Sequence, residues 1–131
     1  PRLIQLLEKK GWEWFILGQD KNPYCCLHHK HERDLTNRTS LPRTLALLSL
    51  AQRLITTDSG PMHLASGVGT PVTALFGPTA KGWGFFPAGP HDMVLEDPTS
   101  CRPCSRHGGQ ACQHDLRCWQ GITPERVMLA L

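Results

Sequence analysis

The sequence has 131 residues, the length of one ordinary domain, which is enough to bury an apolar core. Lys and Arg (14) outnumber Asp and Glu (11), and the net charge of +3 is too mild to indicate a nucleic-acid-binding protein. The longest uncharged stretch, residues 64–80, is broken by glycines and prolines and does not predict a membrane span.

The beginning of the chain and its cysteines bear on its context. No secretory signal peptide is visible, and the chain begins at Pro1 inside a helix-like segment, so we expect one domain of a longer protein. Six cysteines would suit disulfides in a small secreted domain, or metal ligands and free thiols in a cytosolic one. The rest of the chain is typical of a cytosolic α/β domain, which favours the second interpretation.

The first expected elements are a short helix and a buried strand. Apolar residues within positions 3–7 share one side of a helix that Gly11 can end. Residues 12–18 are an aromatic and β-branched run, which predicts a buried strand. Residues 19–34 are polar and predict no particular element.

A second helix is expected from Thr39 or Ser40, either of which can cap it, with Pro42 in its first turn. Apolar residues then recur at three- and four-residue steps up to Leu54, which is the pattern of a helix with one buried face.

The middle of the chain predicts a strand, a helix and a second strand. Residues 53–58 and 71–77 are β-branched and apolar runs, and a helix from about residue 61 to 67 lies between them. This unit implies adjacent parallel strands joined by a right-handed crossover.

The remainder predicts a long loop at 78–92, a short strand at 93–96, a cysteine-rich loop at 99–121 and a terminal helix capped by Thr123. The expected fold class is α/β, a layer sandwich with a parallel sheet, in a single domain of residues 1–131.

The turn after the strand at 53–58 is the main candidate site. Ligands of parallel sheets bind beyond the carboxyl ends of the strands, where the first amides of a following helix lack partners. Gly60 permits close approach of a phosphate, whereas the Asp58 carboxylate suits a sugar hydroxyl. The turn therefore predicts a ligand that carries both groups. The alternative is that Asp58 merely caps the helix or the turn.

Other residues could serve the same site. His63, one helical turn further on, either faces the ligand or packs in the core. The loop after the strand at 71–77 contains Gly77, Pro78 and Thr79 and would face the same crevice, unless it is a plain turn.

Residues 58–79, DSGPMHLASGVGTPVTALFGPT, resemble the signature of glycosyltransferase family 9, the ADP-heptose:lipopolysaccharide heptosyltransferases. The family pattern is roughly D-[ST]-G-x-x-H-[LI]-A-x-x-x-G-x-P-x-[VT]-A-[LI]-F-G-[PS]-T. The likeness is close over residues 35–79 and looser over 1–18 and 93–131.

The resemblance implies that this chain is the C-terminal, donor-binding half of a GT-B enzyme, with a Rossmann-like parallel sheet and helices on both faces. Such an enzyme transfers a heptose-like sugar, with inversion, from a nucleotide-diphosphate sugar to a lipopolysaccharide core or another glycan acceptor. The catalytic base would come from an N-terminal GT-B domain of the same protein. A cytoplasmic location is implied, with at most peripheral association at the inner face of the cytoplasmic membrane. The implied donor-binding residues are Asp58, Ser59, Gly60, Pro61, Met62, His63, Gly77, Pro78 and Thr79.

The sequence departs from the family after residue 18, where a full helix usually follows but residues 19–34 are short and polar. Asp20 and Glu32 are candidate ribose contacts there. The departure favours an alternative in which the domain binds the donor or a partner without catalysis.

Cys101, Cys104, Cys112 and Cys118 form a C-x2-C-x7-C-x5-C pattern. The first pair is a good half-site for structural zinc, and an iron–sulfur cluster, reduced thiols or a disulfide are the alternatives. With the basic and aromatic residues nearby, the same loop allows a third hypothesis, a zinc module that binds nucleic acid; those residues are Arg102, Arg106, Arg117 and Trp119. A second group of ligand types could bind metal or be solvated surface; it comprises Cys25, Cys26, His28, His29 and His31.

Overall fold

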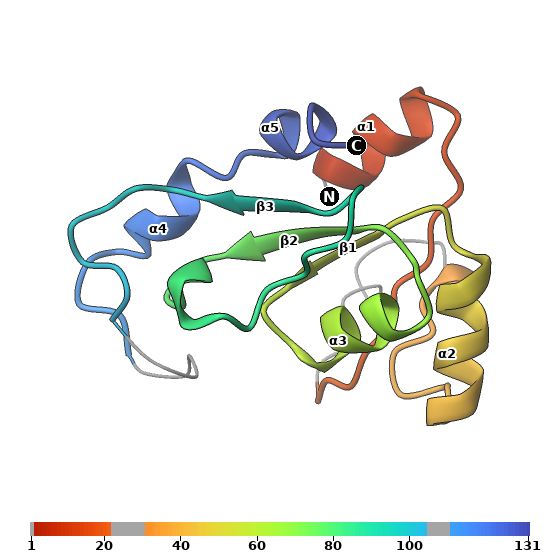
Figure 1. The fold of residues 1–131 in the computed structure, drawn as a ribbon. Helices are drawn as coiled ribbons and strands as arrows, with labels where there is room; N and C mark the ends of the chain where they lie inside the picture. Colours follow the sequence, from red (N-terminus) through yellow and green to blue (C-terminus); the bar gives the residue numbers. More distant parts are fainter. Residues whose placement is uncertain (1, 22–30, 105–110) are drawn as a thin grey trace.

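The computed structural model describes residues 2–21, 31–104 and 111–131 (Figure 1). In these ranges the helices are α1 (Arg2–Lys9), α2 (Leu41–Leu50), α3 (Gly60–Gly67), α4 (Arg117–Gln120) and α5 (Pro124–Met128), with 3-10 helices η2 (His31–Arg33) and η3 (Lys81–Trp83). None of the helices in these ranges is long and apolar enough to cross a membrane.

The sheet is parallel, as the sequence predicts. Its strands are β1 (Leu54–Thr57), β2 (Val72–Phe76) and β3 (Met93–Glu96), in the order β1-β2-β3. Leu54 lies opposite Val72, and Thr73 lies opposite Met93. Helix α3 joins β1 to β2, so the predicted strand–helix–strand unit is confirmed, and the three carboxyl ends lie at one edge.

Helices cover both faces of the sheet (Figure 1). Helix α1 packs against α5 on one side, whereas α2 packs against α3 on the other. The central strand β2 is the most deeply buried of the three, as expected for a strand covered on both faces. The main core contains Leu48, Met62, Ala65, Val72, Ala74 and Phe76.

The predicted helix starts agree with the structure. Ser40 is the residue before α2, and a proline follows in the first turn. Thr123 caps α5, because its hydroxyl oxygen accepts a hydrogen bond from the Arg126 amide. The leucine-rich α2 buries only one stripe, so Leu48 is 1% exposed while Leu50 at its end is 84% exposed.

The strand predicted at 12–18 is wrong in its extent. This segment is extended, but its ladder is limited to one isolated parallel bridge, between Ile16 and Asp34. Trp14 is buried whereas Phe15 is 59% exposed, so the alternation of a strand is present without a full set of strand partners. The physical reason is that, among the described residues, the backbone bonds of this segment go to residues 33–37, along one edge.

Candidate functional site

The turn between β1 and α3 is held by hydroxyl groups. Ser59 Oγ donates to the Thr57 carbonyl oxygen over 3.1 Å and lies 3.0 Å from Thr56 Oγ1. These bonds fix the turn at the carboxyl end of β1, the position where parallel sheets bind ligands. The Ser59 side chain is thus a support of the turn, and its backbone is the part left to meet a ligand.

The start of α3 is open. The Met62 amide donates to the Ser59 carbonyl oxygen over 3.1 Å, but the amides of Ser59 and Gly60 have no acceptor within the described residues. A Cβ atom built on Gly60 would meet nothing within 4 Å. Free amides with open space in front of them are the arrangement that holds a phosphate at a helix N-terminus.

Asp58 does not act as a cap. The residue at the N-cap position is Ser59, and α3 has no side-chain capping hydrogen bond. Among the described residues the Asp58 carboxylate makes no hydrogen bond or ion pair, although the residue is half-buried. The structure therefore gives no support to the interpretation of Asp58 as a helix cap and leaves the carboxylate available beside the free amides.

The other residues of the first turn divide between core and surface. The Met62 side chain is fully buried in the main core, so it packs inside the domain, and the role of this residue in donor binding stays a prediction. His63 is exposed, which excludes the alternative of a core histidine. Pro61 occupies the first turn of α3, where its missing N–H costs nothing.

The second turn, Gly77-Pro78-Thr79, is closed by the cysteine-rich loop. The Arg102 guanidinium donates to the carbonyl oxygens of Gly77 and Thr79, the latter over 2.7 Å. The Cys104 amide donates to the Pro78 carbonyl oxygen over 3.2 Å. Each carbonyl of this turn is therefore occupied by a donor from the loop.

The Trp119 indole packs against Gly77 of the same turn. A Cβ atom on Gly77 would overlap with the Trp119 indole, so Gly77 is required by internal packing. Thr79 is 5% exposed. Gly77 is thus required by its contact with Trp119, and the Thr79 side chain lies inside the domain. The expected contact of Gly77, Pro78 and Thr79 with the donor stays a prediction for the backbone of this turn.

Arg102 also pairs with the end of β3. Its guanidinium lies 2.9 Å from Glu96 Oε1 and 3.0 Å from the Asp97 carbonyl oxygen, and its side chain is 8% exposed. Partial burial raises the pKa of the Glu96 carboxyl, but the hydrogen bond from the Lys81 amide and the contact with Arg102 outweigh it and hold the pKa below its usual value. Sequence reasoning missed this role, because nothing in the local pattern distinguishes Arg102 from a surface arginine.

The four cysteines of the loop are free thiols. Cys104 and Cys112 are exposed, whereas burial, together with Cys101 and the two exposed cysteines, raises the pKa of the Cys118 thiol. Cys112 Sγ accepts hydrogen bonds from the amides of His114 and Leu116, at 3.4 and 3.3 Å. In the described ranges no group of three or more His, Cys, Asp or Glu side chains is placed to hold an ion. The metal site remains a prediction.

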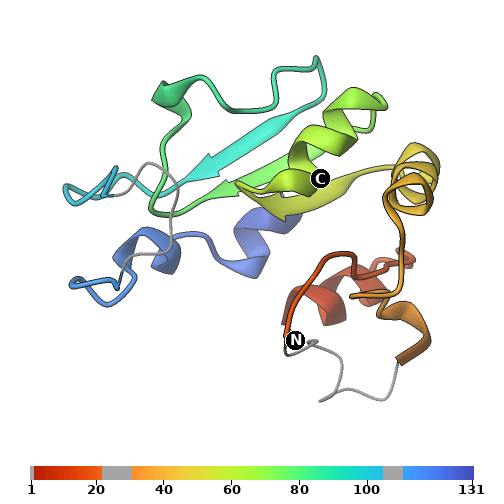
Figure 2. The ribbon, with the colours of Figure 1, turned by 90° about the horizontal axis from the view of Figure 1, so that it is seen from below.

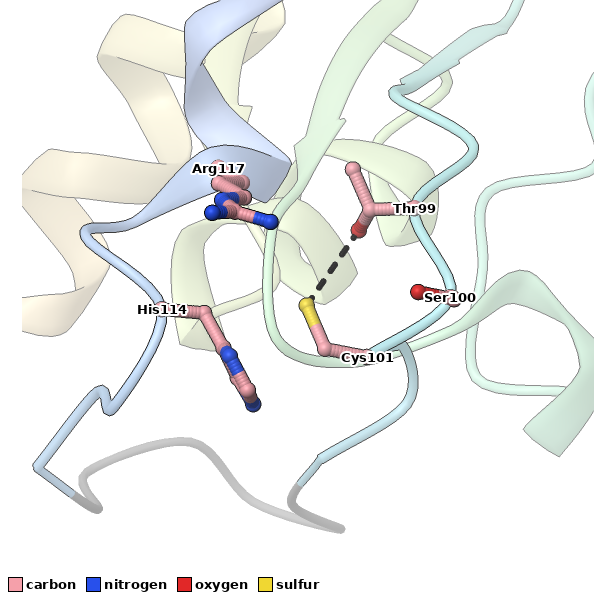
Figure 3. A pocket seen from close by; sticks show the side chains of 5 residues that line it. All are labelled: Thr99, Ser100, Cys101, His114 and Arg117. Atoms are coloured by element: carbon pink, nitrogen blue, oxygen red, sulfur yellow. Dashed lines mark hydrogen bonds between the residues drawn. The ribbon is translucent and has the colours of Figure 1, made fainter.

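A pocket of about 450 Å³ lies on this loop (Figure 3). Thr99, Ser100 and Cys101 form one side of it, and His114 and Arg117 lie across from them. Thr99 Oγ1 is 3.5 Å from Cys101 Sγ. The pocket is separate from the Asp58 turn, since the two share no lining residue.

The nucleic-acid hypothesis loses two of its residues. Arg102 is committed to carbonyl oxygens and Glu96, and Trp119 packs over Gly77. The described parts of the loop, residues 99–104 and 111–121, are hydrogen-bonded to the end of β3 and to the Gly77 turn. Of the other residues named for that role, Arg106 lies outside the described residues.

The N-terminal part contains the candidate ribose contacts and the second group of possible metal ligands. No contact among the described residues joins them to the Asp58 turn. Asp20 exchanges backbone hydrogen bonds with the Asn37 side chain, and Glu32 lies on η2 with His31. The rest of the second group of ligand types lies outside the described residues, namely Cys25, Cys26, His28 and His29.

Comparisons with known proteins find heptosyltransferases that are similar in sequence to part of this chain. Lipopolysaccharide heptosyltransferase 3 of Escherichia coli is 32% identical over 85 residues, which are 59% of this chain and 25% of that protein. Lipooligosaccharide heptosyltransferase 2 of Campylobacter jejuni is 27% identical over 100 residues, or 73% of this chain and 30% of that protein. The chain thus spans less than a third of the length of these curated relatives.

The fold is also that of a solved glycosyltransferase. The structure of E. coli ADP-heptose lps heptosyltransferase II, a GT-B fold, matches 98% of this chain with a TM-score of 0.73 and 24% identity, and 38% of that chain is covered. The expected Rossmann-like parallel sheet is confirmed. The model of glycosyltransferase family 9 (heptosyltransferase) matches residues 2–113. The chain therefore belongs to glycosyltransferase family 9, the heptosyltransferase family.

Proposed function

We propose that the Asp58 turn binds a nucleotide-diphosphate sugar, with the diphosphate on the amides of Ser59 and Gly60 and the sugar hydroxyls on Asp58. The observation that carries this proposal is that, among residues 2–21, 31–104 and 111–131, the Asp58 carboxylate and the amides beside it at the carboxyl end of β1 have no hydrogen-bond partner. A carboxylate repels phosphate but accepts hydrogen bonds from hydroxyls, so the two halves of the turn suit the two halves of such a donor.

In the parent protein this domain would be the donor half of an inverting glycosyltransferase, with a glycolipid or glycan acceptor such as a lipopolysaccharide core. The relatives by name act on lipopolysaccharide or lipooligosaccharide, which supports this acceptor class. A base from an N-terminal domain removes the proton of the acceptor hydroxyl, whose oxygen forms the new bond to the anomeric carbon. The bond from that carbon to the diphosphate breaks, and the leaving diphosphate keeps the electron pair.

The contribution of this chain to that step is electrostatic. The amides at the start of α3 face the leaving group, where negative charge develops as the bond breaks. The cytosol supplies nucleotide sugars, so we also propose a cytoplasmic location, with at most peripheral contact with the inner membrane face.

Calorimetry on the 131-residue chain with ADP-heptose and with ADP tests the proposal. Asp58→Ala should weaken ADP-heptose about tenfold to a hundredfold, the usual cost of a charged hydrogen bond, and leave ADP almost unchanged. Gly60→Val should weaken both ligands, because its side chain would enter the open space before the amides. Asp115→Asn, which changes an exposed carboxylate on the cysteine-rich loop, is the control and should change neither.

Equal losses for ADP and ADP-heptose in Asp58→Ala would show that Asp58 acts on the turn and not on the sugar. Binding without turnover in the full-length parent protein would instead favour a donor-binding domain that has no catalytic role.

A further inference from the structure

The pocket on the cysteine-rich loop, of about 450 Å³, shares no lining residue with the Asp58 turn. One of its walls comes from residues 99–101, and the other comes from His114 and Arg117 (Figure 3). Its volume lies within the usual range of small-molecule sites, which is about 300–1,000 Å³. The side chains of the two walls therefore indicate what kind of molecule the pocket could bind.

Both walls are anchored to the end of β3. Figures 1 and 2 place the described parts of the loop beyond the carboxyl ends of β2 and β3. The Arg102 amide donates to the Thr99 carbonyl oxygen over 3.1 Å, and the Arg102 guanidinium contacts Glu96 and the Asp97 carbonyl oxygen. The second wall leads into α4, and Gly121, directly after α4, donates its amide to the Asp97 carboxylate over 2.9 Å. The same short piece of chain thus fixes the two walls.

A tight turn places the imidazole and the guanidinium in one wall. The Arg117 amide donates to the His114 carbonyl oxygen over 3.1 Å. Asp115 and Leu116 between them have φ angles of 49° and 54°, in the left-handed region that side chains other than glycine seldom adopt. Cys112 Sγ stabilises this turn by accepting hydrogen bonds from the amides of His114 and Leu116. An unfavourable backbone is therefore held in place beside the pocket.

The polar groups of the pocket are of the kind that bind anions. Arg117 contributes a guanidinium and His114 an imidazole, and Thr99 and Ser100 contribute hydroxyls from the opposite wall. Within the described ranges neither the Arg117 guanidinium nor the His114 imidazole has a hydrogen bond or an ion pair. These groups can therefore donate to a ligand without losing an existing bond.

Negative charge is kept away from the pocket. Residues 98–114 of the sequence contain no Asp or Glu. The carboxylates of Glu96 and Asp97 already accept hydrogen bonds from the rest of the domain. Asp115 is exposed, and it does not line the pocket. An anion in the pocket would thus meet a cation and several donors without a carboxylate to repel it.

We propose that this pocket binds a phosphate group, either as the monoester of a phosphorylated glycan or as the free ion. The oxygens of a phosphate point in several directions, so they can accept hydrogen bonds from both walls at once, and Arg117 offsets the negative charge. Among the described lining residues only Cys101 and His114 are metal-ligand types, fewer than a structural zinc site needs. The inference does not depend on the donor proposal, because it concerns other residues.

The test titrates the 131-residue chain with inorganic phosphate, followed by NMR at the backbone amides of residues 99–101 and 114–117. We expect chemical-shift changes that saturate at both walls. Arg117→Gln should weaken phosphate by about tenfold or more, the usual cost of losing a charged hydrogen bond. Because Arg117 is exposed, this variant should keep its fold. Ser100→Ala acts from the opposite wall and should weaken phosphate about threefold.

The control variant is Arg43→Gln, which removes the same charge from the exposed side of α2 and should bind phosphate as the parent chain does. Equal losses in Arg43→Gln and Arg117→Gln would show a general effect of charge and overturn the proposal. Gly60→Val, which fills the space at the Asp58 turn, should leave the shifts of both walls unchanged. Shifts confined to Ser59 and Gly60 in the parent chain would also overturn the proposal.

The source of the phosphate is found with glucose 6-phosphate and glucose as further probes. Tighter binding of glucose 6-phosphate than of inorganic phosphate, with no binding of glucose, would assign the pocket to a phosphorylated glycan. Tighter binding of inorganic phosphate would assign it to the free ion. Loss of binding after treatment with EDTA would show that a metal holds the anion, and would overturn the direct contact with Arg117.

Discussion

The turns that follow β1 and β2 lie at the same edge of the sheet and belong to the same sequence signature, yet they are used in opposite ways. Within the part of the chain that the structure describes, the Asp58 turn leaves amides and a carboxylate without partners, and it has open space at Gly60. The Gly77 turn has each of its carbonyls occupied and its glycine covered by Trp119. A signature can therefore combine a binding surface with the support that holds it, and only the structure distinguishes them.

The largest expected effect, on the free energy of unfolding, comes from removing the Arg102 contacts that hold the Gly77 turn. Arg102→Met removes the guanidinium that serves two carbonyls of the turn and the Glu96 carboxylate, all in a largely buried place. We expect a loss of about 2–4 kcal/mol in the free energy of unfolding, measured with urea, because buried acceptors are left without donors.

The control for this variant is Arg2→Met. Arg2 pairs with Glu125 on the surface, where the two side chains are 62% and 57% exposed. Exposed ion pairs contribute at most about 1 kcal/mol. Similar losses in both variants would contradict the view that Arg102 closes the second turn.

The next effect compares the two glycines directly. Gly77→Ala places a methyl group against the Trp119 indole and should cost about 1–3 kcal/mol, the usual range for overpacking. Gly60→Ala places the same group in open space and should change stability by less than about 0.5 kcal/mol. Thermal unfolding of the pair measures the difference. A larger loss in Gly60→Ala would reverse the comparison.

How far the sequence predicted this architecture depends on the range of the interactions. The strands β1 and β2, the helix between them and the exposed turn at Asp58 follow from local pattern and from the family signature. The role of Gly77 does not, because the contact that requires glycine comes from Trp119, far along the chain. The burial of the Met62 side chain does not follow from the signature either, because a helix directs successive side chains to different sides.

The strand predicted at 12–18 is wrong for a different reason. Its composition and alternation are those of a strand, since Trp14 is buried and Phe15 is exposed. A strand also needs partners, and the bonds to residues 33–37 serve one edge alone. The sequence of a segment describes its own preference, whereas its pairing depends on what lies beside it.

The reactivity of the cysteine thiols should show how the loop packs beside the Gly77 turn. Cys104 and Cys112 are exposed, and Cys118 is buried with a raised pKa, so it stays a neutral thiol at neutral pH. We expect iodoacetamide to modify Cys104 and Cys112 at least about tenfold faster than Cys118, as followed by mass spectrometry. Equal protection of all four cysteines, with near-stoichiometric zinc or iron in untagged protein, would instead establish the metal site that the cysteine spacing predicts.

The smallest expected change in the free energy of unfolding is that of a variant at the Asp58 turn, and it separates a structural role of Asp58 from a ligand-binding one. Because the Asp58 carboxylate makes no hydrogen bond or ion pair within the described residues, Asp58→Ala has no interaction to break in the unliganded domain. We expect its free energy of unfolding to stay within about 0.5 kcal/mol of the parent chain. The natural comparison is Thr123→Ala, which removes a hydroxyl that does cap a helix and should cost about 1 kcal/mol. If Asp58→Ala lost as much as Thr123→Ala, the carboxylate would be a structural cap after all. If it lost nothing while sugar affinity fell, then this carboxylate would serve the ligand and not the fold.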